Sequence, residues 1–233
     1  MNLIAFETST EACSVAVWRD GEVLERFEIA PRRHAELALP WAQALLAEAG
    51  MARSQLDAVA VGRGPGAFTG VRLGIALSQG IALALDLPML PVSTLAALAL
   101  RAERPGKVLA AIDARMGEVY AGTFERVGAD LVALGPETVC APDAVQLPAG
   151  GDHAWHGVGT GFAAVEGALQ AALEPRLASV NATALPRAGD IARLAAQAFA
   201  RGEQVAPELV EPAYLRDNVA LTLEEQHALR AAR

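Results

Sequence analysis

The sequence predicts an α/β protein with two lobes, each built from a mixed sheet with helices. Three observations support this prediction. Short apolar segments typical of strands alternate with longer apolar segments typical of helices along the 233 residues. A succession of strands, a tight turn and strand–helix units begins at Leu3 and begins again at Val108. Between the halves, Arg104-Pro105-Gly106 interrupts the pattern.

The first half is expected to fold as a hairpin followed by alternating helices and strands. The expected elements are strands at Leu3 to Phe6, Ser14 to Trp18 and Glu22 to Ile29, a helix within His34 to Ala49, a strand at Asp57 to Val61, a helix at Phe68 to Asp86, a strand at Pro88 to Val92 and a helix to about Ala102. Asp20-Gly21 is a hairpin turn signal, and Ser93 is a helix cap. Pro40 marks either the start of its helix or a kink in it.

The second half repeats this order less regularly. Strands are expected at Val108 to Asp113, Val119 to Phe124 and Ala154 to Val158, with an irregular section up to Asp152, a helix after Gly159-Thr160-Gly161 to about Leu173, and an amphipathic helix at Ile191 to Arg201. The predicted organisation is a first lobe (1–104), a second, smaller lobe (105–206) and a polar tail (207–233) that packs on the body and has a helical segment at Leu223 to Leu229. There is no convincing sequence repeat between the lobes.

Composition restricts the classes of function. The formal charge of −8 disfavours direct binding of a polyanion, because Lys and Arg contacts with phosphate dominate nucleic-acid affinity. Cys13 and Cys140 are too far apart in the sequence to suggest a metal site and are typical of a reduced cytoplasmic chain. Met1 to Phe6 lacks the basic start of a signal peptide, and the run from Val71 to Leu85 is judged too short to span a bilayer. We therefore expect a soluble cytoplasmic protein that does not associate with membranes.

A glycine-rich turn precedes the long helix. Gly62, Gly64 and Gly66 surround Pro65, so this segment is shaped either to hold an anion or to fit tightly against another surface. Gly64, Gly66, Thr69 and Arg72 are the candidates for an anion site at the start of the helix. The segment matches neither a Walker loop nor the dinucleotide fingerprint.

The candidate catalytic groups favour no enzymatic reaction. His34 has no second histidine four residues later, and His153 and His156 would point to opposite faces of a strand, so no metal site is predicted. Hydroxyls near Glu7 lack the setting of a nucleophile. The hairpin turns at residues 7–11 and 113–118 lack early glycines, which disfavours close approach to a phosphate, so ATP binding by this chain is not expected.

The segment from Phe68 to Leu85 is apolar or small on every side, which requires cover on every side. Gly70, Gly74, Ser78 and Ala82 form a ridge of small residues that allows close helix packing. Leu37, Trp41 and Leu45 of the preceding helix could supply the cover, and so could another subunit.

Motifs over almost the whole chain resemble those of a known family. They are Met1 to Val17, Gly64-Pro65-Gly66-Ala67-Phe68-Thr69-Gly70-Val71-Arg72, Asp113-Ala114-Arg115, Glu118-Val119-Tyr120 and Pro212-Ala213-Tyr214-Leu215-Arg216. Together they resemble the TsaB (YeaZ) family of bacterial tRNA threonylcarbamoyladenosine biosynthesis proteins. Two positions differ from the family pattern: Glu7 stands where Asp is more usual, and Ala67 where Ser is often found.

The resemblance implies an actin-like two-lobed fold and a non-catalytic subunit. It implies that the chain binds and activates the catalytic paralogue TsaD, together with the ATPase TsaE, and meets tRNA only through that complex. The residues that the resemblance and the apolar helix suggest for partner binding are Leu37, Trp41, Leu45, Gly70, Val71, Gly74, Leu77, Ser78 and Ile81. Two alternatives remain at this point: an autonomous metal- or nucleotide-dependent enzyme, and a stand-alone homodimer.

Overall fold

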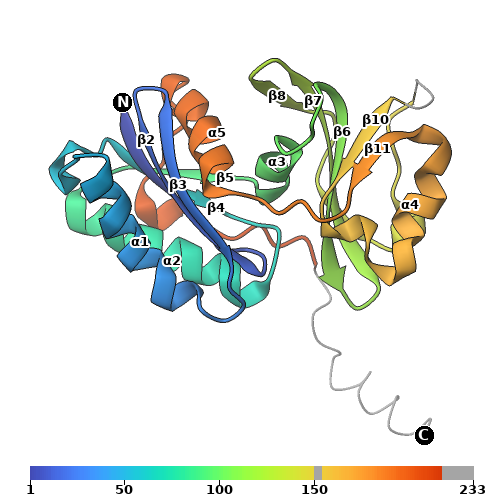
Figure 1. Cartoon of the computed structure of the whole chain (residues 1–233), viewed down its shortest axis with the longest axis horizontal. Helices are drawn as coiled ribbons and strands as arrows, with labels where there is room; N and C mark the ends of the chain where they lie inside the picture. Colours follow the sequence, from blue (N-terminus) through green and yellow to red (C-terminus); the bar gives the residue numbers. More distant parts are fainter. Residues whose placement is uncertain (150–153, 217–233) are drawn as a thin grey trace, which may run out of the picture.

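The structure, a computed structural model, describes residues 1–149 and 154–216, which form two sheets side by side with helices on their faces (Figure 1). The first sheet has the order β3-β2-β1-β4-β5. Its strands are β1 (Asn2–Glu7), β2 (Ala12–Arg19), β3 (Glu22–Ile29), β4 (Ala58–Gly62) and β5 (Met89–Val92). The predicted hairpin is confirmed, because β2 and β3 pair antiparallel around Asp20 and Gly21.

The second sheet has the order β11-β10-β6-β7-β8, with β9 also paired to β7. Its strands are β6 (Gly106–Arg115), β7 (Glu118–Val127), β8 (Asp130–Ala133), β9 (Thr138–Cys140), β10 (Trp155–Val158) and β11 (Leu177–Asn181). In each sheet the first strand pairs antiparallel with the hairpin that follows it and parallel with a later strand. The two sheets therefore share one topology, which confirms the prediction of two similar lobes.

Both faces of the first sheet are covered by helices of this chain. Helices α1 (His34–Glu48) and α2 (Phe68–Leu85) cover one face, where Ile4 and Phe6 of β1 point. Helix α5 (Ala188–Ala200) covers the other face, where Leu3 and Ala5 point. Because β1 is buried on both faces, its sequence is a continuous apolar run rather than an alternating one.

Two helices pack on the sheet of the other predicted lobe. Helix α3 (Thr94–Ala99), expected in the first lobe, packs on β6 and β7 of the second sheet. Helix α5, expected in the second lobe, packs on the first sheet. The chain thus passes to the second sheet before α3 and returns to the first sheet before α5, and these two helices contact each other between the sheets (Figure 1). The predicted lobes, 1–104 and 105–206, are therefore wrong for these two helices, each of which belongs to the core of the other lobe.

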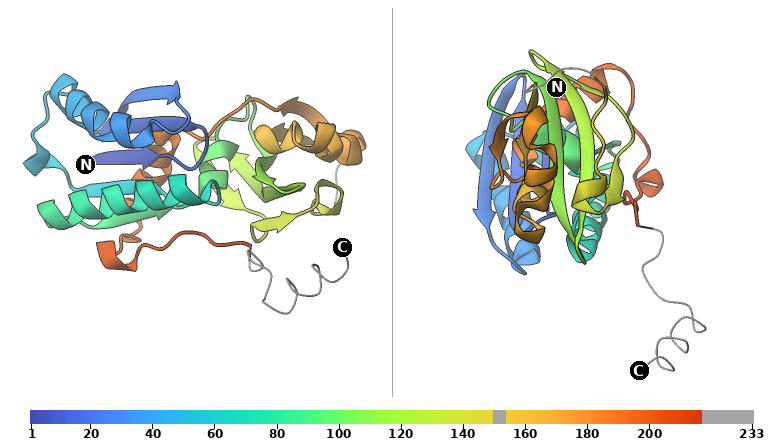
Figure 2. Two further views of the ribbon diagram at one scale, coloured as in Figure 1. Left: turned by 90° about the horizontal axis from the view of Figure 1, so that it is seen from below. Right: turned by 90° about the vertical axis from the view of Figure 1, so that its right-hand side faces the viewer.

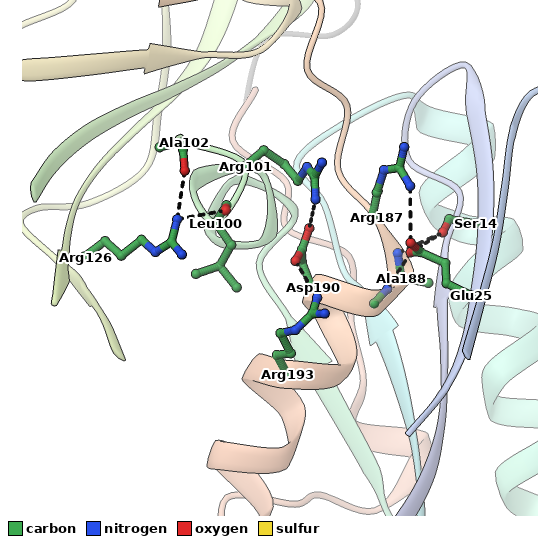
Figure 3. Close-up of polar contacts among 11 residues, drawn as sticks. Ser14, Glu25, Leu100, Arg101, Ala102, Arg126, Arg187, Ala188, Asp190 and Arg193 are labelled. Atoms are coloured by element: carbon green, nitrogen blue, oxygen red, sulfur yellow. Dashed lines mark hydrogen bonds and ion pairs between the residues drawn. The ribbon is translucent and has the colours of Figure 1, made fainter. Parts of the chain in front are cut away.

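Charged groups join α3 and α5 at this crossing (Figure 3). Asp190 on α5 is buried, accepts a 2.9 Å hydrogen bond from Arg193 and lies 3.5 Å from the guanidinium of Arg101. Burial raises the pKa of the Asp190 carboxyl, and the two arginines oppose that rise. Arg126 on β7 donates to the carbonyls of Leu100 and Ala102 at the end of α3. These contacts fix α3 and α5 relative to both sheets.

Several boundaries differ from the prediction. Pro40 lies inside α1, which is one helix that begins at His34. The irregular section contains β8 and β9, and β11 was not predicted. The helix expected after Gly161 is mostly short 3₁₀ turns, with α4 (Ala168–Leu173) as its only α-helical part in the described chain. Ser93 caps α3 as predicted by accepting a hydrogen bond from the amide of Ala96. The helical segment at Leu223 to Leu229 lies outside the described residues.

Helix α2 has 18 residues. By length and composition alone it could cross a membrane, so the prediction that this run is too short is wrong. Its inner face packs against β4, β1 and β5 of the same chain.

Replacing Asp190 with alanine is expected to lower the free energy of unfolding by about 1–3 kcal/mol, because hydrogen bonds to charged groups contribute about that much. Urea denaturation of the isolated chain measures the change. Asp130→Ala, at an exposed position on β8, is the control and should change stability by less than about 0.5 kcal/mol. Equal stability of the two variants would contradict a structural role for Asp190.

Candidate functional site

The glycine-rich turn fits tightly against the β1–β2 turn of the same chain. A Cβ on Gly62 would lie 2.0 Å from Oε2 of Glu7, and a Cβ on Gly66 would lie 2.4 Å from the carbonyl oxygen of Ser9. Gly64 has a φ of +92°, a conformation that other residues rarely adopt. The amide of Ala67 donates to the Ser9 carbonyl at 2.7 Å. The sequence left open an anion site or a tight fit against another surface, and the structure shows a tight fit against the chain's own turn.

Glu7 lies at the centre of this contact. Its carboxylate is buried and accepts hydrogen bonds from the amide of Ser9 (2.7 Å), the hydroxyl of Ser9 and the hydroxyl of Thr94 (3.1 Å). The Thr94 hydroxyl also accepts a 3.2 Å bond from the amide of Gly64. Burial raises the pKa of Glu7, although the bonds from Ser9 and Thr94 oppose the rise. The Glu7 carboxylate thus links β1, the glycine-rich turn and α3, and its hydrogen bonds are made to residues of the same chain.

The ridge of small residues on α2 also faces inward. A Cβ on Gly70 would lie 2.1 Å from the carbonyl oxygen of Thr8, and a Cβ on Gly74 would lie 2.6 Å from the Thr8 hydroxyl. That hydroxyl donates a 2.8 Å hydrogen bond to the carbonyl of Gly70. Small residues at these positions let α2 approach the turn after β1.

This orientation corrects part of the predicted partner surface. Leu45, Gly70, Val71, Gly74 and Ser78 are buried inside the chain and offer no accessible surface. The remaining predicted residues, Leu37, Trp41, Leu77 and Ile81, are partly buried and pack at the edge of the same core.

The exposed apolar surface lies on the opposite side of α2. We call it the α2 outer face, and it consists of the exposed Ala76, Gly80, Leu83 and Ala84 with the half-buried Leu73 and Leu77 at its border. Leu83 is 65% exposed, and Leu39 on the neighbouring α1 is 45% exposed. Spacings of three and four residues place the members of this face on one stripe. They carry no charge, and α2 contains no Asp, Glu or Lys. Comparing the two stripes of α2 could have found this face, since the stripe without the glycine ridge is the one left to cover.

A cleft of about 1140 Å³ separates the lobes at the start of α2. The β1–β2 turn, the starts of α1 and α2, the β6–β7 turn and residues 212–216 line it. At the β6–β7 turn, where the sequence lacks an early glycine, Arg115 and Met116 have positive φ angles. The Arg115 guanidinium donates a 2.7 Å hydrogen bond to the Asp113 carboxylate.

Thr69 and Arg72 line this cleft, whereas Gly64 does not. The Arg72 guanidinium lies 3.2 Å from the centre of the Phe68 ring and 4.8 Å from that of Tyr214. It also donates a 3.2 Å hydrogen bond to the Phe68 carbonyl. Arg72 therefore joins two aromatic rings, a structural role at the mouth of the cleft.

The histidines of the described residues serve local structure. Nε2 of His34 lies 3.0 Å from the Thr10 carbonyl and 3.2 Å from the Ala12 carbonyl, so the ring holds the β1–β2 turn. His156 bonds with the Ser179 hydroxyl at 2.8 Å, and His153 lies outside the described residues. Among residues 1–149 and 154–216, no group of three His, Cys, Asp or Glu side chains could hold a metal ion.

Two α/β lobes of one topology, joined by crossing helices and separated by a cleft, define the class of actin-like two-lobed proteins. Residues 27–223 match the family model described as TsaD: tRNA N6-adenosine threonylcarbamoyltransferase. The chain is 44% identical to the tRNA threonylcarbamoyladenosine biosynthesis protein TsaB of Escherichia coli, over 94% of this chain and 96% of that protein. The TsaB protein of Haemophilus influenzae is 38% identical, over 94% of this chain and 95% of its own length.

A solved structure gives the same result. YeaZ from Pseudomonas aeruginosa superposes with a TM-score of 0.85 at 47% identity, covering 92% of this chain and 99% of that one. The chain belongs to the TsaB (YeaZ) family, as the motifs indicated.

Gly70→Ala is expected to lower stability by about 1–3 kcal/mol, because the new methyl group would overlap the Thr8 carbonyl. Gly80→Ala is the matched control on the same helix. A Cβ there meets nothing within 4 Å, so this variant should gain up to about 1 kcal/mol from helix propensity. Thermal unfolding followed by circular dichroism measures both variants, and a neutral Gly70→Ala would contradict the inward orientation of the ridge.

The raised pKa of Glu7 predicts a pH dependence of stability. The folded chain binds a proton more tightly here than the unfolded chain, whose group titrates near 4.5. Stability from this proton is therefore complete below that pH and is lost as pH rises through the folded-state pKa, by about 1.4 kcal/mol per unit of difference. Glu7→Gln should remove this loss.

The measurement compares urea denaturation of the wild type and Glu7→Gln at pH 5 and pH 8. The variant should gain stability relative to the wild type at the higher pH. Exposed Glu11→Gln is the control and should leave the wild-type profile unchanged. Parallel profiles of Glu7→Gln and the wild type would show that Glu7 titrates normally.

Proposed function

We propose that this chain takes part in tRNA threonylcarbamoyladenosine biosynthesis as a non-catalytic subunit. In this role it binds and activates a catalytic paralogue of the TsaD type, acts together with the ATPase TsaE, and works in the cytoplasm, where tRNA is modified. The names of its relatives support the pathway. The observation that carries the subunit role is the α2 outer face, an uncharged stripe of exposed and half-buried apolar residues.

Exposure of this stripe has a physical cost that a partner would remove. Burial of apolar surface is favourable by a free energy of about 25 cal/mol for each Å² removed from water. Contiguous exposed apolar patches on folded proteins therefore mark interaction sites. Trp41 and Leu37 of α1 are partly buried against the same core that α2 covers, so docking would extend over both helices. We infer that the contact is made by the outer stripe rather than by the buried glycine ridge.

An autonomous enzyme receives less support. Glu7 is occupied by Ser9 and Thr94, His34 by two carbonyls, and Arg115 by Asp113. Of these groups, His34 and Arg115 line the cleft, and both are bonded to groups of this chain. We propose that the chain has no cofactor of its own. A second copy of this chain could use the same outer face, so a homodimer is the competing assembly.

Leu83→Arg is expected to weaken binding to the TsaD-type subunit about 10-fold, because the most exposed large apolar side chain of the stripe is replaced by a charge that must be desolvated. Size-exclusion chromatography with light scattering detects the complex, and titration calorimetry gives the affinity. Val132→Arg is the matched control: Val132 is also apolar and exposed, but it lies on β8 of the second sheet.

The same mixtures are then assayed for threonylcarbamoyl transfer to tRNA with ATP and TsaE present. Activity only in the mixture, reduced by Leu83→Arg and unchanged by Val132→Arg, is the expected outcome. Transfer by this chain alone would identify an enzyme instead. A dimer of the chain that persists when the paralogue is added, without a mixed complex, would favour the homodimer.

A further inference from the structure

Residues 204–216, which we call the strap, leave the end of α5 and run from the first lobe to the second. Figure 2 shows this segment, in red, passing beneath α2 toward the second sheet. It begins on the first sheet, where Val205 and Met89 exchange two backbone hydrogen bonds of 2.9 Å. The amide of Gln79 on α2 donates to the carbonyl oxygens of Pro207 (2.8 Å) and Val210 (3.3 Å). Val210 is buried in the core under α2, so this end is fixed to the first lobe.

The other end of the strap is fixed to the second lobe. The Arg216 guanidinium pairs with the Glu118 carboxylate at 2.5 Å and donates to the carbonyl of Ala114 at 3.1 Å. Both partners belong to the β6–β7 hairpin. The Arg216 side chain is only 18% exposed, which places the pair in a setting where it is screened less than a surface ion pair.

Between these ends the strap touches the first lobe again. The amide of Ala213 donates to the carbonyl of Arg63 at 2.8 Å. The ring of Tyr214 lies over the guanidinium of Arg72, which lies over Phe68. Tyr214 and Phe68 are 58% and 65% exposed, so the stack stands at the surface and depends on the cation between the two rings.

The strap also divides the space between the lobes. Residues 212–216 line the large cleft, and Leu215 also lines a second cavity of about 530 Å³ next to α3 and α5. The α3–α5 crossing borders only the smaller cavity. The strap therefore forms part of the wall of the large cleft and lies between it and the smaller cavity.

We infer that the strap is a clasp that sets the separation of the two lobes at the cleft. Tyr214 holds it to α2, and Arg216 holds it to the β6–β7 hairpin. Loss of the Arg216 pair frees the strap from the β6–β7 hairpin, so that among the described residues the lobes stay joined through α3 and α5, and the cleft widens. Loss of the Tyr214 stack loosens the strap beside the start of α2, although the bonds of Val205 and Ala213 still hold it to the first lobe. The inference concerns the isolated chain and does not depend on the proposed partner.

The test measures the distance between the lobes by electron–electron double resonance of two nitroxide labels. Exposed Gln43 on α1 and exposed Gln170 on α4 are replaced by cysteine, with Cys140→Ala to remove a partly exposed thiol. Arg216→Ala and Tyr214→Ala are introduced into this background. Glu211→Ala, at an exposed position on the same strap, is the control.

Arg216→Ala and Tyr214→Ala should broaden the distance distribution and move it to longer distances, while Glu211→Ala keeps the wild-type distribution. Glu118→Ala removes the same ion pair from the other lobe and should reproduce the effect of Arg216→Ala. The double variant should add nothing further. Circular dichroism establishes that each labelled variant is folded. Wild-type distributions in folded Arg216→Ala and Glu118→Ala would overturn the inference, because the lobes would then be held without the strap.

Discussion

The contact of α2 with the turn after β1 is the constraint on which the first lobe depends. Gly70 and Gly74 bring the helix against Thr8, and Gly66 brings the preceding turn against Ser9. Buried Glu7 binds the same turn and the start of α3. Because these contacts leave no room for a Cβ, they fix the rotation of α2 about its axis. That rotation decides which stripe faces the core and which faces outward.

Sequence patterns predicted the fold class, both lobes and most of the strands, because buried strands and the Asp20-Gly21 turn have strong local signals. Two kinds of feature escaped them. β8, β9 and β11 are short, and β8 and β9 lie among turn residues, so tertiary pairing rather than local preference forms them. The partners of α3 and α5 depend on contacts between distant parts of the chain, which no local pattern contains.

For the candidate site, the sequence identified the glycine ridge of α2, and the structure places that ridge against the chain's own β1–β2 turn. An apolar helix with a glycine ridge favours close packing, but the same ridge suits a partner's backbone and the chain's own turn equally well. Only the position of Thr8 distinguishes them. The absence of a histidine pair around His34 was readable from spacing alone, and the structure adds that the ring holds two carbonyls of the β1–β2 turn.

The exchange of α3 and α5 between the sheets has a consequence for synthesis on the ribosome. The strands of the first sheet are complete at Val92, but α5, which covers one of its faces, ends at Ala200. During translation that face, with Leu3 and Ala5, stays open to solvent until about a hundred more residues have emerged. The nascent first half is thus an aggregation-prone intermediate, and cutting the chain near Arg104 would yield two fragments that each lack a helix of their own core.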